Sequence, residues 1–203
     1  MLLICVVALA VLGGCDTGDG KQLKPYDPAD YPVATTAPPE VEGFDSVPTG
    51  ETFEPLTLTL PWTDGGDIDV EYTCDGDDIA PALSWGGLPV DTVDVAIAMV
   101  DDSAVSNGQP FVHWVIAGLD PAEIALAAGD VPDGSIQALN FFGDIGYGGP
   151  CPPPGDDAHS YRFTVFALNQ RLELADGTPA SEFLDAIATI AVASTDAIGI
   201  YQR

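Results

Sequence analysis

The sequence predicts an all-β domain: an antiparallel two-sheet β-sandwich with a peripheral helix near the C-terminus. Three observations support this class. After Gly50, short stretches typical of strands alternate with turn residues. Several of these stretches are apolar on both faces, as buried strands are. Only one stretch, beginning near Ser181, has helical spacing. A chain with many strands and one helix buries its apolar faces most simply by packing two sheets together.

The predicted elements follow one another along the folded part of the chain. Residues 53–60 place leucines on one side and threonines on the other, which predicts a half-buried strand. The run Asp64-Gly65-Gly66-Asp67 then predicts a turn. Buried strands are predicted at residues 93–100, 111–117 and 161–168. Apolar side chains recur at helical spacing in the last element, namely Phe183, Leu184, Ile187, Ile190 and Ala191.

The composition changes twice, which divides the chain into a lipoprotein-type signal peptide (1–14), a disordered linker rich in Pro, Asp and Thr (15–50) and a folded domain (51–203). Residues 2–12 are an apolar run too short to span a bilayer. It ends in Leu-Gly-Gly-Cys15, which resembles the lipobox whose cysteine receives a diacylglyceryl group. The alternative is an uncleaved anchor. Both place the domain in the cell envelope, extracytoplasmic and held at the membrane surface.

Charge excludes one class of partner. The chain carries 32 acidic and 5 basic side chains, for a formal net charge of −27. Such a surface repels phosphate backbones and anionic lipids, so we expect no nucleic-acid binding, and contact with membrane only through the N-terminal lipid. Solubility in a salty or crowded setting explains the acidity better than binding of a partner or cation through the acidic surface does.

Two cysteines remain in the folded part, Cys74 and Cys151. In an oxidising compartment, such a pair suggests one disulfide. Zinc binding is a weaker alternative, because neither cysteine has the Cys-x-x-Cys spacing. We therefore expect no metal and no cofactor.

The only two histidines, His113 and His159, are the candidate functional residues. His113 lies in the middle of an apolar strand. Period-two alternation puts it on one face with Phe111 and Val115, and puts Val112 and Trp114 on the other. A single buried histidine is more often a core residue than a functional one, so His113 alone decides nothing.

The residues around His159 point to a functional role more clearly. It follows a long Gly/Pro loop, residues 140–155, and shares a strand face with Tyr161. Such loops are uncommon unless they have a function. A His-x-Tyr pair beside exposed backbone N–H groups suits a small anion. Asp101-Asp102 closes the strand at 93–100, and a carboxylate there could fix a histidine tautomer and raise its pKa.

Five motifs occur in order: Tyr-Thr-Cys-Asp-Gly (72–76), Pro-Ala-Leu-Ser-Trp (81–85), Phe-Val-His-Trp-Val (111–115), Gly-Tyr-Gly-Gly-Pro-Cys-Pro-Pro (146–153) and His-Ser-Tyr (159–161). Together they resemble the phosphatidylethanolamine-binding protein family, in its bacterial YbhB/YbcL (Raf-kinase-inhibitor-like) branch. The resemblance implies a large antiparallel sheet packed against a smaller one. It also implies a cavity for phosphate or phosphorylated headgroups, lined by Asp101, His113, Gly149, Pro152, Pro153, His159 and Tyr161.

The chain departs from the family pattern at two places. The family's Asp-Pro-Asp-Ala-Pro stretch reads Asp-Asp-Ser-Ala-Val here (101–105), which implies a looser turn and a different ligand preference. Phe141 also stands where the family often has Asp.

We therefore expect a lipid-anchored extracytoplasmic binding protein for a small anion or phosphorylated headgroup, and not an enzyme. The first alternative is a regulator that inhibits a kinase or protease by contact with an unidentified protein partner. A hydrolase is less favoured, because the sequence offers no Gly-x-Ser-x-Gly or His-Glu-x-x-His motif.

Overall fold

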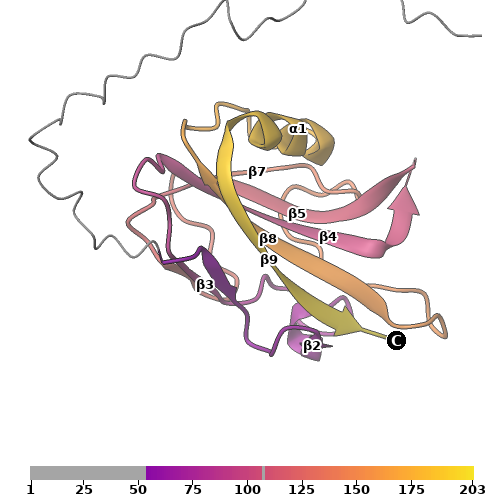
Figure 1. Cartoon of the computed structure of the whole chain (residues 1–203). Coiled ribbons are helices and arrows are strands. Elements are labelled where there is room, and N and C mark those ends of the chain that lie inside the picture. Colours follow the sequence, from indigo (N-terminus) through magenta and orange to yellow (C-terminus); the bar gives the residue numbers. More distant parts are fainter. Residues whose placement is uncertain (1–53, 107) are drawn as a thin grey trace, which may run out of the picture. The chain divides into compact units, whose positions relative to one another are not determined.

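A computed structural model describes residues 54–106 and 108–203, which form nine strands, one α-helix and one 3-10 helix (Figure 1). The predicted signal peptide, the linker and Cys15 lie outside the described residues. The strands make a three-stranded sheet of order β1-β3-β6 and a six-stranded sheet of order β2-β9-β8-β4-β5-β7. The small sheet comprises β1 (Thr57–Thr59), β3 (Leu83–Gly86) and β6 (Ala125–Leu126). The large sheet comprises β2 (Gly66–Asp67), β4 (Asp94–Ser106), β5 (Gln109–Leu119), β7 (Ile136–Gln137), β8 (His159–Leu168) and β9 (Ala191–Tyr201).

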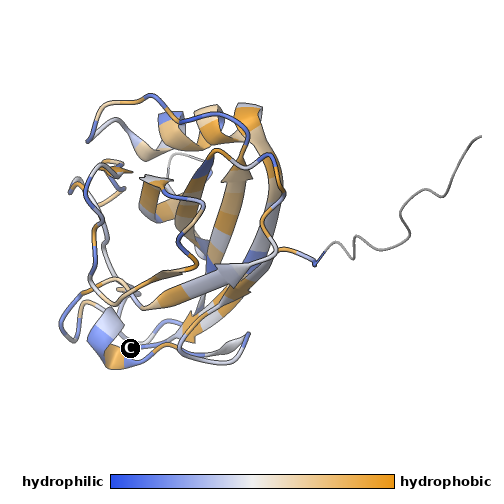
Figure 2. Ribbon diagram, turned by 90° about the vertical axis from the view of Figure 1, so that its left-hand side faces the viewer, coloured by the Kyte–Doolittle hydropathy of each residue, from blue (hydrophilic) through white to orange (hydrophobic). Residues whose placement is uncertain are grey.

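Both sheets contribute side chains to one hydrophobic core, which we call the inter-sheet cluster. Its members include Leu83 and Trp85 from β3, Ile97 and Met99 from β4, Trp114 from β5 and Phe163 from β8. Figure 2 shows hydrophobic residues (orange) along these strands. The three predicted buried strands are confirmed as parts of β4, β5 and β8, whose central residues are almost all buried.

The other face of the large sheet packs against α1 (Ala180–Ile190), as Figure 1 shows. Phe183 and Ile187 are buried there, with exposed fractions of 0 and 1%. They belong to a second core, the helix-side cluster, together with Val112, Val115, Ala117 and Leu168. The helix predicted from the apolar spacing is therefore confirmed.

The large sheet is mixed, which corrects the expectation of purely antiparallel sheets. β2 pairs with β9 in parallel, with Gly66 opposite Gly199 and Asp67 opposite Ile200. The predicted turn at Asp64-Gly65-Gly66-Asp67 is therefore only half right, since its second half is this strand. The parallel pairing occurs because β9 would otherwise be an edge strand with unpaired backbone groups on the side away from β8. Backbone and side-chain bonds from the 64–68 segment satisfy its polar groups, including Ile198 N to Asp64 Oδ1 at 2.7 Å.

No strand was predicted at β9, which begins at the residue after α1 ends. Ala191, predicted to be the last helical position, is the first residue of this strand. The sequence of β9 (Ala191–Tyr201) mixes strand-favouring Val, Thr, Ile and Tyr with Ala, Ser, Asp and Gly, so its local strand signal is diluted. Pairing with β8 along ten residue pairs decides its conformation.

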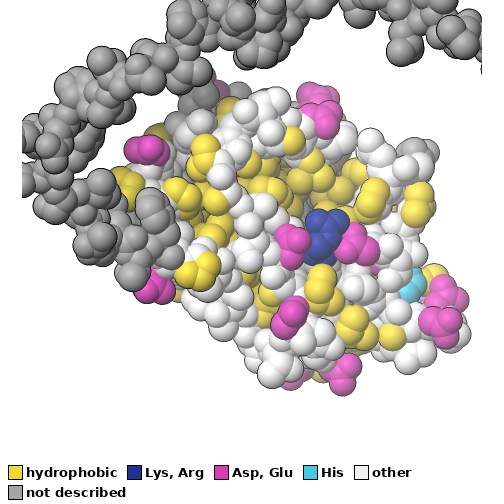
Figure 3. All heavy atoms as spheres, viewed as in Figure 1, with side chains coloured by type: hydrophobic (Ala, Val, Ile, Leu, Met, Phe, Trp, Pro, Cys, Tyr) yellow, Lys and Arg dark blue, Asp and Glu magenta, His cyan; other side chains and the backbone are white. Residues whose placement is uncertain are grey.

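Acidic side chains (magenta) are spread over the face shown in Figure 3, with far less basic surface (dark blue). Among the described residues, the only basic side chains besides the histidines are Arg162, Arg171 and Arg203. Within residues 54–106 and 108–203, no helix has the length and apolarity needed to cross a bilayer.

Candidate functional site

A small cavity lies where the ends of β4, β5 and β8 meet the Gly/Pro loop. Its volume is about 100 Å³. The residues that line it are Asp101, Ala104, Phe111, His113, Phe142, Cys151, Pro152, Pro153, His159 and Tyr161. Six of the seven residues predicted for the ligand site are in this wall. The seventh, Gly149, is not among the lining residues and acts on the loop instead, as described below.

A β-bulge aims His113 at the cavity. Along β4 and β5, Met99 pairs with Trp114, but the next residue, Val100, pairs with Val112, so His113 is the extra residue. The period-two prediction for this strand is therefore wrong. Val112 lies in the helix-side cluster and Trp114 in the inter-sheet cluster, whereas strict alternation would have put them on one face.

His113 is held by a backbone carbonyl. Its Nδ1 lies 2.7 Å from the carbonyl oxygen of Gly148. A carbonyl oxygen only accepts, so this contact assigns the proton to Nδ1 and leaves Nε2 as the free ring nitrogen. The side chain is 2% exposed. Burial lowers the pKa of His113, while the bond to Gly148 and the charges of Asp101 and Asp78 act in the opposite direction.

His159 is held by the Asp101 carboxylate, whose Oδ2 lies 2.7 Å from His159 Nδ1. The other carboxylate oxygen, Oδ1, accepts from the backbone N–H groups of Ser103 and Ala104 at 2.8 and 3.2 Å. Asp101 is 2% exposed, so all of its strong acceptor capacity is used within the fold. This pairing also assigns the proton of His159 to Nδ1.

The residues after Asp101 are held to β8 by side-chain hydrogen bonds. The sequence predicted that the strand closes at Asp101-Asp102, but β4 continues to Ser106 across an irregular stretch of the ladder. Asp102 accepts two hydrogen bonds from Arg162, at 2.8 and 2.9 Å. Ser103 Oγ accepts from Ser160 N at 2.9 Å. These contacts attach the segment at Asp102 and Ser103 to β8.

Tyr161 forms the floor of the cavity. It is fully buried, and its hydroxyl has no hydrogen-bond partner among the described residues. Its ring stacks on His159 with a centroid distance of 6.3 Å and meets the edge of His113 at 5.2 Å. Burial and the Asp101 charge raise the pKa of Tyr161, so the hydroxyl stays protonated and can donate to a ligand.

Sequence reasoning missed two aromatic members of the wall, Phe111 and Phe142. Their ring centroids are 4.9 Å apart, and Phe142 lies 5.1 Å from His113. Phe142 is 48% exposed, so it forms the rim. The available signal was the Phe141-Phe142 pair inside a Gly/Pro loop, where a core residue is not expected.

The Gly/Pro loop is tied to residues 72–78 at several points. Tyr147 Oη donates to Tyr72 O at 2.6 Å, and Cys74 N donates to Pro150 O at 3.2 Å. A disulfide joins Cys74 to Cys151, which itself lines the cavity. The loop wall is thus fixed by covalent and polar contacts together.

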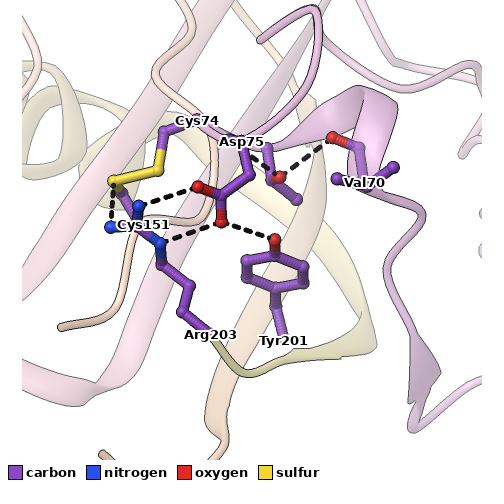
Figure 4. A network of polar contacts seen from close by, with 7 residues as sticks. Val70, Cys74, Asp75, Cys151, Tyr201 and Arg203 are labelled. Carbon is purple, nitrogen blue, oxygen red and sulfur yellow. Dashed lines mark hydrogen bonds and ion pairs between the residues drawn. A yellow bond between two sulfur atoms is a disulfide. The ribbon is translucent and has the colours of Figure 1, made fainter. Parts of the chain in front are cut away.

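The C-terminal end of the chain braces the same disulfide (Figure 4). Asp75, next to Cys74, accepts two hydrogen bonds from the Arg203 guanidinium, at 2.7 and 2.8 Å, and one from Tyr201 Oη at 2.8 Å. Arg203 also approaches Cys151 Sγ at 3.6 Å. The hydrogen bond from Tyr201 and the Arg203 side chain lower the pKa of Asp75.

The polar atoms of the cavity depend on protonation. With both imidazoles neutral, each Nε2 is an acceptor and only Tyr161 Oη donates. Protonation of both rings turns each Nε2 into a charged donor, which changes the site charge from −1 (Asp101) to +1. In the described residues, no group of three or more His, Cys, Asp or Glu side chains is arranged to hold a metal ion.

Comparison with known proteins gives a consistent family. The family model described as "Phosphatidylethanolamine-binding protein" matches residues 59–202. A Mycobacterium tuberculosis protein named "Putative lipoprotein LppC" is 35% identical over 200 residues, which covers 97% of this chain and 92% of that protein. A UPF0098 protein of Methanothermobacter thermautotrophicus is 38% identical over 150 residues, covering 71% of this chain and 97% of that protein.

Two solved structures are also similar to this chain. CT736 of Chlamydia trachomatis, described as a phosphatidylethanolamine-binding protein homologue, superposes with a TM-score of 0.68 at 29% identity, covering 73% of this chain and 98% of that one. YbcL of Escherichia coli has a TM-score of 0.69 at 23% identity, covering 74% and 99%. The YbcL match bears on the fold alone.

Proposed function

This chain belongs to the phosphatidylethanolamine-binding protein family, in its YbhB/YbcL-like branch, and from that membership we propose that it is a lipid-anchored, extracytoplasmic binding protein for a small anion or phosphorylated headgroup. The ligand is held by the two histidines and Tyr161, with Asp101 and the Pro152-Pro153 wall in support. The name of the M. tuberculosis relative supports the lipid anchor at Cys15.

One observation carries the proposal: the only two histidines of the chain come together in one cavity, and each has its Nδ1 atom engaged by the fold. Both free Nε2 atoms are therefore available for a ligand. A buried core histidine is also hydrogen-bonded through one ring nitrogen, so the argument rests on the fact that both rings line the same cavity.

The size of the cavity limits the ligand. A volume of about 100 Å³ holds an oxyanion or the head of a phosphomonoester. Ligand sites for larger molecules usually span roughly 300 Å³ or more, so a nucleotide does not fit inside. The rest of a headgroup ligand stays outside, beside the exposed ring of Phe142.

The proposal is tested by titrating the ¹⁵N-labelled domain with phosphate and with phosphoethanolamine and following amide and imidazole NMR signals. His113→Asn and His159→Asn are the informative variants, because the Asn amide can replace the Nδ1 donor while Nε2 is deleted. We expect chemical shift changes around the cavity that weaken in both variants. Arg171→Gln, at an exposed arginine outside the cavity wall, serves as the control. Binding that is equal in both His variants and wild type contradicts the proposal.

A further inference from the structure

One peptide group links Asp78 to His113. The N–H of Gly149 donates to Asp78 Oδ1 at 2.7 Å. The carbonyl oxygen of Gly148 accepts from His113 Nδ1 at 2.7 Å. These two atoms belong to the same amide, so the carboxylate, the peptide and the imidazole form one continuous chain of hydrogen bonds. Such chains polarise each member, because a donor that gives to a charge makes its own carbonyl a stronger acceptor.

The local backbone is shaped for this contact. A Cβ on Gly149 would lie 2.5 Å from Tyr72 O and 2.6 Å from Asp78 Oδ1, so only glycine permits the approach. On Gly148, a Cβ would lie 2.7 Å from the ring of Phe142. Asp78 itself is the only described non-glycine residue with positive φ, at 54°. Left-handed backbone is uncommon outside glycine and costs conformational energy, so three neighbouring positions are constrained at one contact.

The peptide is also fixed from its other side. Gly148 N donates to the backbone oxygen of His113 at 3.1 Å, so Gly148 both gives to and receives from this residue. The position of the peptide relative to the ring is therefore set by two bonds, and Asp78 supplies the charge.

In both histidines a carboxylate orients the imidazole ring through its Nδ1 atom. Asp101 contacts His159 directly, whereas Asp78 reaches His113 through a peptide. The ionisable groups around His113 are Asp101 on β4, His159 and Tyr161 on β8, and Asp78 with Tyr147 from the loop side. Burial lowers the pKa of His113, and the negative charges of Asp101 and Asp78 oppose that change.

We propose that Asp78 is a positioning residue of the cavity, which acts through the Gly148–Gly149 peptide to hold His113 in the Nδ1–H tautomer and to favour its protonation. This role of Asp78 matters for function only if the cavity binds an anion as proposed, because a protonated His113 donates Nε2–H to that ligand. Asp78 itself does not touch the ligand, because it is absent from the cavity wall.

The test needs no ligand. Asp78→Asn keeps an oxygen that accepts from Gly149 and removes the charge. Asp77→Asn makes the same change of net charge at the neighbouring residue, which is exposed like Asp78. Imidazole ¹⁵N and ¹³C shifts of the labelled domain are followed across pH. Asp78→Asn should lower the pKa of His113, because it removes a negative charge that favours the protonated ring. It should also raise the Nε2–H tautomer population, and Asp77→Asn should leave both unchanged.

Equal His113 tautomer and pKa values in the two variants would overturn the proposal, even if Asp78→Asn lowers thermal stability. Asp78→Ser, whose hydroxyl can also accept from Gly149, is a second neutral variant. Together with phosphate titration, these measurements distinguish the role of Asp78 from the proposed binding function. If the His113 pKa moves but phosphate does not bind, the role of Asp78 stands and the binding function falls. If phosphate binds and the pKa does not move, the role of Asp78 falls.

Discussion

Anion binding by this cavity should take up protons. Because Gly148 O and Asp101 Oδ2 fix both protons on Nδ1, each neutral ring turns an acceptor, Nε2, toward a ligand that has only acceptors. The perturbation is pH, and the best probe is sulfate, since it stays a dianion between pH 5 and 9. Phosphate itself titrates near neutral pH and would hide the effect.

The magnitude follows from proton linkage. Where the rings are neutral, each proton that must be added weakens the apparent affinity about tenfold per pH unit, which corresponds to about 1.4 kcal/mol. One protonated ring brings the site charge to zero and two bring it to +1. A dianion therefore favours two protons, and its Kd should rise between about tenfold and about a hundredfold for each pH unit. Because burial lowers the pKa of His113, the gain on acidification should continue below the ordinary histidine pKa of 6.5.

Isothermal titration calorimetry in two buffers of different ionisation enthalpy measures the protons taken up directly. His113→Asn and His159→Asn each remove one imidazole from the cavity, so each should reduce the number of protons taken up on binding. A Kd for sulfate that stays constant from pH 5.5 to 8.5, with no buffer-dependent heat, would refute the tautomer assignment on which this reasoning depends.

Three further outcomes are expected from unfolding in urea. Replacing Cys74 and Cys151 by serine opens a loop with a sequence separation of 77, and should cost about 4 kcal/mol in the chain-entropy account; an equal midpoint in the reduced and oxidised wild type would contradict it. Gly149→Ala places a Cβ 2.5 and 2.9 Å from backbone atoms and should cost about 2 kcal/mol, whereas Gly86→Ala, whose nearest contact is 3.5 Å, is the control. Burial lowers the pKa of His113, so the unfolded chain takes up its proton first. Wild type should therefore lose stability relative to His113→Asn as the pH falls from 7.5 to 5.5; the opposite trend would show that His113 is protonated in the fold.

Sequence patterns were sufficient for the central strands. Residues 93–100, 111–117 and 161–168 are apolar on both faces, and such runs have few alternatives to a buried strand. The helix was equally predictable, because it packs one side on the sheet and its apolar residues therefore recur at helical spacing. By contrast, β2 has only Gly and Asp, which disfavour strands, and β9 mixes strand-favouring residues with Ala, Ser, Asp and Gly, so both depend on their pairing partners.

The same division applies to the cavity. The spacing of His159 and Tyr161 is local, and a strand places residues two apart on one face. The bulge at His113 depends on how β4 pairs with β5, which no local pattern states. Asp78 acts across 71 residues of sequence, and its contact becomes visible only when the loop is in place.

Cys151 has two roles, because it forms the disulfide with Cys74 and also lines the cavity. Oxidation therefore fixes one part of the cavity wall, and we expect the reduced chain to bind a ligand more weakly than the oxidised one. Material produced in a reducing cytoplasm should accordingly be checked for free thiols before any weak binding is attributed to the native protein.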